Sequence, residues 1–293
     1  MRDLLKRRPV VAWALYDWAN SAFATTVMAG FFPTFFKQFW SVGADPTEST
    51  VRLGLANAAA GFVIAVLAPV LGAIADRGGR RKQFLLAWTA LGVLATAGLY
   101  FVAQGEWQLA VGLFVLGTMG FNGAIVFYDS MLLDVARPAE FDRVSALGFS
   151  AGYLGGGLLF AFNVLMTLQP AWFGLSGAAA AVQLSFLSVA IWWLLFTIPL
   201  ARHVEPQQVV APVPMLLAIR AGLDELRDTI RHLSRYRPIA IFLLAYWLYI
   251  DAVNTIIKMA IDYGLSLGLP ASGLLAALLL TQFVAFPAAL LFG

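Results

Sequence analysis

The sequence predicts an all-α polytopic membrane protein. Of its 293 residues, 61% are hydrophobic and 12% are charged, and the mean hydropathy is +0.81. Eight apolar runs are each long enough for a helix to cross a hydrocarbon core, which takes about 20 residues. This composition excludes a soluble globular domain. The absence of cysteine excludes a disulfide framework and a thiolate metal site.

The eight predicted spans cover residues 10–36, 53–75, 84–103, 109–134, 144–168, 179–200, 238–262 and 271–292. The first is too long for a signal peptide and lacks a small-residue cleavage site. Sixteen Lys and Arg residues lie in the N-terminus and in alternate loops, whereas only Lys37 and Arg52 lie in the loops between them. By the positive-inside rule the N-terminus is cytoplasmic. We expect a multi-pass protein of a bacterial inner membrane, with lipid as its partner; the net charge of +3 does not indicate nucleic acid.

One long connection divides the predicted helices. It separates residues 1–201, a six-helix N-terminal half, from residues 238–293, the start of a second half. Within the linker, 202–237, apolar residues recur at spacings of three and four among arginines, namely Leu216, Ile219, Leu223, Leu226, Ile230 and Leu233. This pattern predicts an amphipathic helix on the cytoplasmic membrane surface, or alternatively a helix that binds a partner protein.

A polar pattern occurs twice inside apolar runs. It reads Trp13, Asp17, Asn20 and Ser21, and again Trp247, Asp251, Asn254 and Thr255, each pair 234 residues apart. A carboxylate at membrane depth costs about 3 kcal/mol or more, so a chain that repeats one is expected to use it. The repetition predicts two related halves around a polar centre, as in secondary transporters.

The connection after the second span carries a short glycine-rich and basic motif. It comprises Gly72, Asp76, Arg77, Gly79, Arg80 and Arg81. The motif resembles the signature between helices 2 and 3 of the major facilitator superfamily. The resemblance implies a cytoplasmic latch that holds the outward-open state, with Gly79 in a tight turn and Gly72 at a close helix approach. A basic cytoplasmic turn that serves topology alone explains the arginines but not Asp76 with both glycines.

The fifth predicted span is rich in glycine. Gly148, Gly152 and Gly156 are one helical turn apart, a spacing that lets helices approach closely. The run resembles the fifth-helix motif of superfamily antiporters, with Tyr153 in place of its proline. Helix packing alone is the simpler interpretation.

Several segments resemble the vacuole-effluxer-like branch of this superfamily, whose fungal members export amino acids. They are Tyr16–Phe23, Phe31–Pro33, Phe127–Asp129, Ser145–Gly156 and Tyr249–Thr255. The resemblance implies a secondary active transporter that works by alternating access and exports amino acids or similar small polar solutes. It also implies twelve helices, so we expect the eight found here to be the six-helix half plus two, with four missing and no transport by this piece alone.

The candidate substrate and coupling residues are Asp17, Asn20, Asn122, Asp129, Asp251, Asn254 and Lys258. Asp251 and Lys258 are seven residues apart and share a helix face, so together they offer both charges that a zwitterion needs. A membrane-embedded carboxylate could also carry a proton, which makes protons a candidate partner. Simpler roles are structural for Asp129, interhelical hydrogen bonds for Asn122 and Asn254, and a helix boundary for Asp134 and Asp262.

Other functions are less well supported. An acyl- or glycosyl-transferase needs an acid–base or metal centre, but both histidines lie in the 202–237 loop and no nucleotide-binding loop occurs. We therefore expect no enzyme activity, no cofactor and no metal site. A scaffold or sensor, and a lysolipid transporter of the same fold, remain alternatives. The sequence leaves the cargo, its direction, the coupling ion and the oligomeric state open.

Overall fold

The structure, a computed structural model, describes residues 2–77, 80–205, 215–233 and 236–292. This part of the chain consists of helices and short connections, without a β-strand. The long helices are α4 (Pro46–Arg77), α5 (Arg81–Gly98), α6 (Trp107–Ser130), α8 (Phe141–Leu168), α9 (Ala178–His203), α10 (Met215–Leu233), α11 (Arg237–Ser266) and α12 (Ala271–Phe292). Short pieces are α1 (Arg2–Leu5), η3 (Leu99–Phe101), α7 (Leu132–Val135), η4 (Pro138–Glu140) and η5 (Pro170–Phe173).

Seven helices in the described ranges are long and apolar enough to cross a membrane, namely α4, α5, α6 with α7, η4 with α8, α9, α11 and α12. The remaining predicted span, the first, is also helical, but its hydrogen-bond pattern changes along its length. It runs through α2 (Arg8–Ala22), η1 (Phe23–Phe31), α3 (Phe32–Phe35) and η2 (Phe36–Trp40), where η1 and η2 are π-helical. The predicted all-α, multi-span fold is therefore confirmed.

The π-helical winding was not predicted from the sequence. In η1 and at the end of η2 the backbone N–H reaches the carbonyl five residues back, as from Ser41 to Phe36 at 2.8 Å. Such turns are rare and occur mainly at functional sites. The winding extends this helical run to Trp40, past the predicted end at residue 36.

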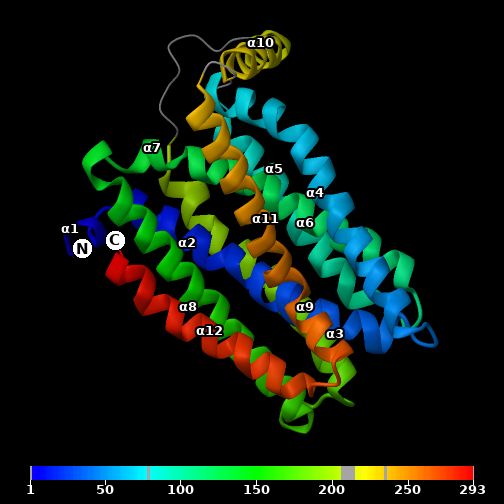
Figure 1. The fold of residues 1–293 in the computed structure, drawn as a ribbon. Helices are drawn as coiled ribbons and strands as arrows, with labels where there is room; N and C mark the ends of the chain where they lie inside the picture. Colours follow the sequence, from blue (N-terminus) through cyan, green and yellow to red (C-terminus); the bar gives the residue numbers. More distant parts are fainter. Residues whose placement is uncertain (1, 78–79, 206–214, 234–235, 293) are drawn as a thin grey trace.

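The first helical run is the central element of the bundle (Figure 1). Its α2 segment packs on α8 and α9, α5 packs on α6 and α9, and α12 runs along α8. Large aromatic side chains fill the core: Phe32 stacks on Phe114 with ring centroids 4.0 Å apart, and Trp40 stacks on Phe186 at 5.7 Å. Each offset or tilted aromatic pair adds about 0.5–1.5 kcal/mol beyond the area that it buries.

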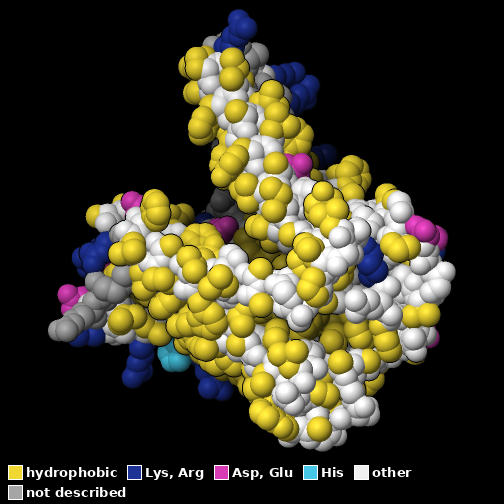
Figure 2. All heavy atoms as spheres, turned by 60° about the horizontal axis from the view of Figure 1, so that its bottom comes forward, with side chains coloured by type: hydrophobic (Ala, Val, Ile, Leu, Met, Phe, Trp, Pro, Cys, Tyr) yellow, Lys and Arg dark blue, Asp and Glu magenta, His cyan; other side chains and the backbone are white. Residues whose placement is uncertain are grey.

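The exterior of the bundle is largely apolar. Figure 2 shows a face covered mostly by hydrophobic side chains, with the charged ones mainly toward its edges. Large residues such as Leu94, Phe62 and Phe242 are exposed. Side chains of this kind suit contact with lipid tails and would be unfavourable in water. The protein is accordingly a multi-pass integral membrane protein.

The helix expected in the linker is present as α10. It lies at the end of the bundle where α4 ends and α11 begins, and it contacts both of them (Figure 1). The adjoining residues 206–214 and 234–235 lie outside the described part of the chain. Its place at the membrane surface stays a prediction.

The helix α11 is attached to the rest of the bundle mainly near its C-terminal end. Along the helix, only Ile261, Asp262 and Gly264 are buried, whereas most residues before them are exposed. The helix α11 contacts η1 and α3 of the first helical run, and it also contacts α4. Asp262 is thus buried where α11 joins the first helical run and α4.

Candidate functional site

Asp17 lies at a close approach of α2 and α8. Its Oδ1 accepts a hydrogen bond from Ser21 Oγ at 3.3 Å, one helical turn away. Across the helix interface stands Gly152: a Cβ there would be 2.5 Å from Ser21 Oγ and 3.2 Å from the Asp17 Cγ. The absence of a side chain at Gly152 thus makes room for the Asp17 carboxylate.

Two further glycines of α8, Gly148 and Gly156, lie against the same helical run. A Cβ at Gly148 would be 2.7 Å from the Trp13 ring and 3.0 Å from the Tyr128 hydroxyl. A Cβ at Gly156 would be 2.9 Å from both the Ser21 carbonyl and the Thr25 hydroxyl. The predicted packing residues therefore face α2 over three turns.

An aromatic layer borders Asp17. Trp13 stacks on Tyr128 with ring centroids 4.3 Å apart and donates from Nε1 to the Tyr128 carbonyl at 3.1 Å. The Tyr16 hydroxyl is 2.7 Å from the Thr89 hydroxyl. These contacts tie α2 to α5 and α6, so the position of Asp17 is fixed from three sides.

Asn20, the third residue of the repeat, is buried at 1% exposure. Neither its amide nitrogen nor its amide oxygen has a hydrogen-bond partner among the described residues. The Tyr128 hydroxyl is in the same situation. Leaving buried polar groups unpaired is costly, typically about 1–3 kcal/mol each, so these atoms mark a region suited to binding a polar solute.

Asp129 and Asn122 come from α6 and differ in their surroundings. Asp129 is exposed and directly follows Tyr128, whose ring stacks on Trp13. Asn122 is half-buried and donates to the Thr118 carbonyl of its own helix at 2.9 Å. Asp17 and Asp129 thus lie on two helices that the Trp13–Tyr128 contact joins, while the Asn122 amide is engaged locally.

The second copy of the repeat lies on α11. Asp251 and Asn254 are exposed and Lys258 is half-buried, seven residues from Asp251 on the same helix face. Among the described residues, no hydrogen bond or ion pair joins Asp17 to Asp251. The two copies also differ in environment: Trp13 is 3% exposed, whereas its counterpart Trp247 is 65% exposed.

The basic motif is described only in part. Gly79 lies outside the described residues, and the side chains of Asp76 and Arg77, at the end of α4, are not described either. Among the described residues, a Cβ at Gly72 would meet nothing within 4 Å, so the described part of the chain does not show the close helix approach expected there. Arg80 is exposed, and Arg81 pairs with the buried Asp134 at 3.6 Å.

Two ion pairs were missed by the sequence analysis. Arg7 pairs with Glu140 at 2.8 Å and connects the N-terminus to the loop before α8. Lys37 pairs with Asp262 at 3.0 Å, although Asp262 was interpreted as a helix boundary. The available signal was that Lys37 and Asp262 are opposite charges near the C-terminal ends of the first and seventh predicted spans.

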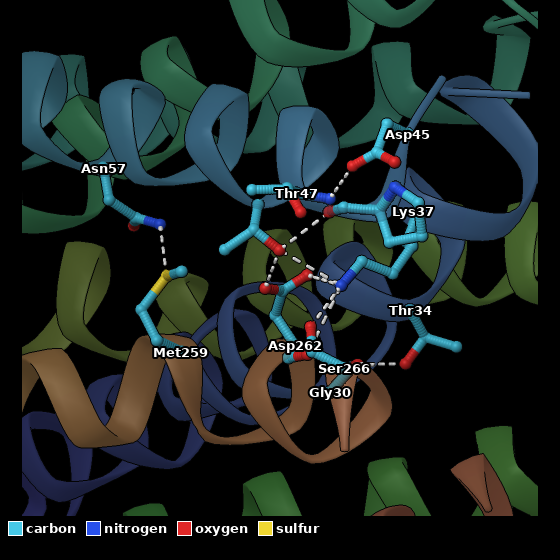
Figure 3. Close-up of polar contacts among 11 residues, drawn as sticks. Gly30, Thr34, Lys37, Asp45, Thr47, Asn57, Met259, Asp262 and Ser266 are labelled. Carbon is cyan, nitrogen blue, oxygen red and sulfur yellow. Dashed lines mark hydrogen bonds and ion pairs between the residues drawn. The ribbon is translucent and has the colours of Figure 1, made fainter. Parts of the chain in front are cut away.

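The Lys37–Asp262 pair is buried and surrounded by hydroxyl groups (Figure 3). The side chains are 12% and 1% exposed. Lys37 Nζ also donates to Ser266 Oγ at 2.8 Å and to Thr50 Oγ1 at 3.1 Å, and Thr50 Oγ1 donates to Asp262 Oδ2 at 2.7 Å. Pro46, Thr50, Asp262 and Ser266 help to line a cavity of about 650 Å³ between α4 and α11.

The family described as "Vacuole effluxer Atg22 like" matches residues 47–293. The chain belongs to this family. An uncharacterized MFS-type transporter of Bacillus subtilis (strain 168), YxiO, is 39% identical over 285 residues, with 96% of this chain and 66% of the relative covered. Autophagy-related protein 22 of Coccidioides immitis (strain RS) is 21% identical over 377 residues, with 92% of this chain and 62% of the relative covered.

Solved structures of the same architecture bear out the major-facilitator fold. The xylose transporter XylE from E. coli, in a partially occluded inward-open conformation, superposes with a TM-score of 0.65 at 13% identity. That match covers 96% of this chain and 70% of XylE. A D-xylose–proton symporter gives 0.64 at 15% identity, covering 96% and 66%. The Atg22-like chain spans 58–66% of the length of its first curated relatives.

Proposed function

We propose that the protein is a secondary active transporter that works by alternating access and exports amino acids or similar small polar solutes. The observation that carries this proposal is the Asp17 carboxylate, which accepts from Ser21 and faces Gly152. It lies on the same helix as the buried amide of Asn20, which has no partner among the described residues. A purely structural bundle would gain nothing from a carboxylate embedded among membrane helices. A transporter gains a site that can take up and release a proton.

The second half of the site is proposed to bind the solute. Asp251 presents a carboxylate for an amino group, and Lys258, two turns further along the same face, presents an ammonium group for a carboxylate. This pair of charges fits a zwitterion better than a sugar or a simple amine. Membership of the "Vacuole effluxer Atg22 like" family supports an efflux direction.

The proposed arrangement in the membrane follows the basic loops. We place the N-terminus and α10 on the cytoplasmic side of a bacterial inner (plasma) membrane, and the similarity to a Bacillus protein supports a bacterial plasma membrane. Residues 1–201 form one half, residues 202–237 a cytoplasmic linker, and residues from 238 onward begin the second half. The latch role of the motif around Asp76 is part of this proposal.

A ligand screen followed by a flux measurement tests the proposal. The protein, expressed at its natural length, is purified in detergent, and its unfolding temperature is recorded with each amino acid and with lysolipids. A stabilising amino acid should then cross proteoliposome membranes under a pH gradient. Stabilisation by lysolipid alone would favour the lipid-transporter alternative, and binding of an amino acid without flux would favour a sensor.

A further inference from the structure

The Lys37–Asp262 pair joins three separate elements at the non-cytoplasmic end of the bundle. Lys37 lies on η2, Thr50 on α4 and both Asp262 and Ser266 on α11. Figure 3 shows the lysine side chain reaching toward Asp262 and Ser266 on the facing helix. Residues 225 positions apart in the chain are thereby connected, since Lys37 Nζ also lies 3.4 Å from the Asp262 carbonyl.

Lys37 and Asp262 make more polar contacts than residues that only cap a helix would make. The ammonium group has four oxygen neighbours: Asp262 Oδ1, the Asp262 carbonyl, Thr50 Oγ1 and Ser266 Oγ. The carboxylate accepts a hydrogen bond from Thr50 at Oδ2, whereas its Oδ1 contacts Lys37 as an ion pair without hydrogen-bond geometry. Burial of two charges is tolerated only when such additional hydrogen bonds satisfy them. The arrangement is therefore specific for this pairing of η2, α4 and α11.

The position of the Lys37–Asp262 ion pair agrees with a contact that closes the non-cytoplasmic side of the bundle. Along α11 the burial is confined to Ile261, Asp262 and Gly264, so the ion pair lies in the region where this helix is attached to the first helical run. If the two halves part on the non-cytoplasmic side, Lys37 and Asp262 must separate and become hydrated. Water stabilises two separated charges well, so the open arrangement is also an accessible state.

We propose that Lys37, Thr50, Asp262 and Ser266 form an ionic lock that holds the non-cytoplasmic side of the transporter closed. Opening the lock is a required step in presenting the site to that side. The inference rests on the proposed alternating-access function and extends it by naming the residues of the gate. The π-helical turns of η1 and η2 place Lys37 at this junction and are the segment expected to rewind when it opens.

Thiol labelling tests the lock without any need to know the solute. These 293 residues contain no cysteine, so Ile261→Cys adds one thiol at a buried position beside Asp262, and the same protein without this substitution gives the background labelling. Cells or oriented vesicles carrying the natural-length protein are treated with a membrane-impermeant maleimide from the non-cytoplasmic side. Adding Asp262→Asn should speed labelling about tenfold or more, because one buried charge loses its partner.

Two further variants separate a lock from a merely structural contact. The apolar double variant, Lys37→Met with Asp262→Leu, should return labelling to the reporter's own rate or below, since no charge is left unpaired. Glu48→Gln is the matched control: it breaks the Glu48–Arg52 ion pair within α4 on the same side and should change nothing. A structural role alone predicts lower thermal stability in Asp262→Asn with unchanged labelling.

The outcomes distinguish the lock from the transport proposal. Unchanged labelling in folded Asp262→Asn, or equally fast labelling in Glu48→Gln, overturns the lock even if amino-acid flux is observed. Faster labelling without any flux supports the lock and overturns the proposed cargo. If Asp262→Asn does not yield folded protein, Ser266→Ala is the variant that tests the lock. It removes one acceptor of Lys37 and should still speed labelling of the Ile261→Cys reporter. An unchanged labelling rate in Ser266→Ala overturns the lock.

Discussion

Asp17 of α2 faces Gly152 of α8 so closely that a Cβ at position 152 would lie 3.2 Å from its carboxylate carbon and oxygen. The acidic side chain therefore occupies space that a glycine makes available. Asp17 belongs to the repeated polar pattern of the sequence, whereas Gly152 belongs to the glycine spacing of the fifth predicted span. The structure brings them together at one helix crossing.

Gly152→Ala should impair the protein at this crossing. The added methyl group would be 2.5 Å from Ser21 Oγ, so α2 and α8 must move apart at a cost of about 1–3 kcal/mol. We expect a lower unfolding temperature in detergent and slower flux. Gly112→Ala, on α6, is the control because its Cβ would meet nothing within 4 Å. Equal stability of the two variants would contradict the close approach.

Asp251 and Lys258 should affect solute recognition more than folding. Both are accessible on α11, so Asp251→Asn and Lys258→Gln should leave the unfolding temperature nearly unchanged. Each should lower amino-acid flux at least about tenfold, the effect of losing one charge-assisted hydrogen bond. Amines should no longer compete with the solute in Asp251→Asn, and carboxylic acids should no longer compete in Lys258→Gln. If both variants transport at the wild-type rate, the zwitterion site lies elsewhere.

Asp134 should be important for the stability of the junction between α7 and the start of α5. Its carboxylate is fully buried and 3.6 Å from Arg81, so Asp134→Ala leaves a partly buried guanidinium without this partner. Breaking a buried pair costs about 3–5 kcal/mol. Thermal unfolding in detergent measures the loss. The exposed Asp3–Lys6 pair is the comparison, and Asp3→Asn should shift the unfolding temperature very little. Similar shifts in both variants would contradict this difference.

The spans and several contact residues could be predicted from the sequence because they follow from local patterns. Runs of about 20 apolar residues mark the helices, and the spacing of Gly148, Gly152 and Gly156 marks one packing face. The bundle places this face against Trp13, Asp17 and Ser21 of the first helix, a pairing that no local pattern specifies.

Other features depend on tertiary contacts that the sequence does not encode locally. The π-helical turns of η1 occur in an ordinary apolar stretch, Phe23–Phe31, without a sequence signal that distinguishes them from an α-helix. Asp262 lies at the end of a predicted span, where a boundary residue is the simplest interpretation. Its burial depends on Lys37, which is far away in the chain. Gly72 fits a packing motif, but within the described ranges no atom lies within 4 Å of a Cβ placed there.

The central claim is that an acidic side chain inside the membrane takes part in transport. The most direct test compares the natural-length protein with its Asp17→Asn variant in proteoliposomes under an imposed pH gradient, using the amino acid that stabilises the protein best. The substitution keeps the shape and a hydrogen-bond acceptor for Ser21 but removes the charge and the titratable proton. We predict that gradient-driven flux falls at least about tenfold while the variant stays folded. Flux at the wild-type rate in folded Asp17→Asn would contradict the account.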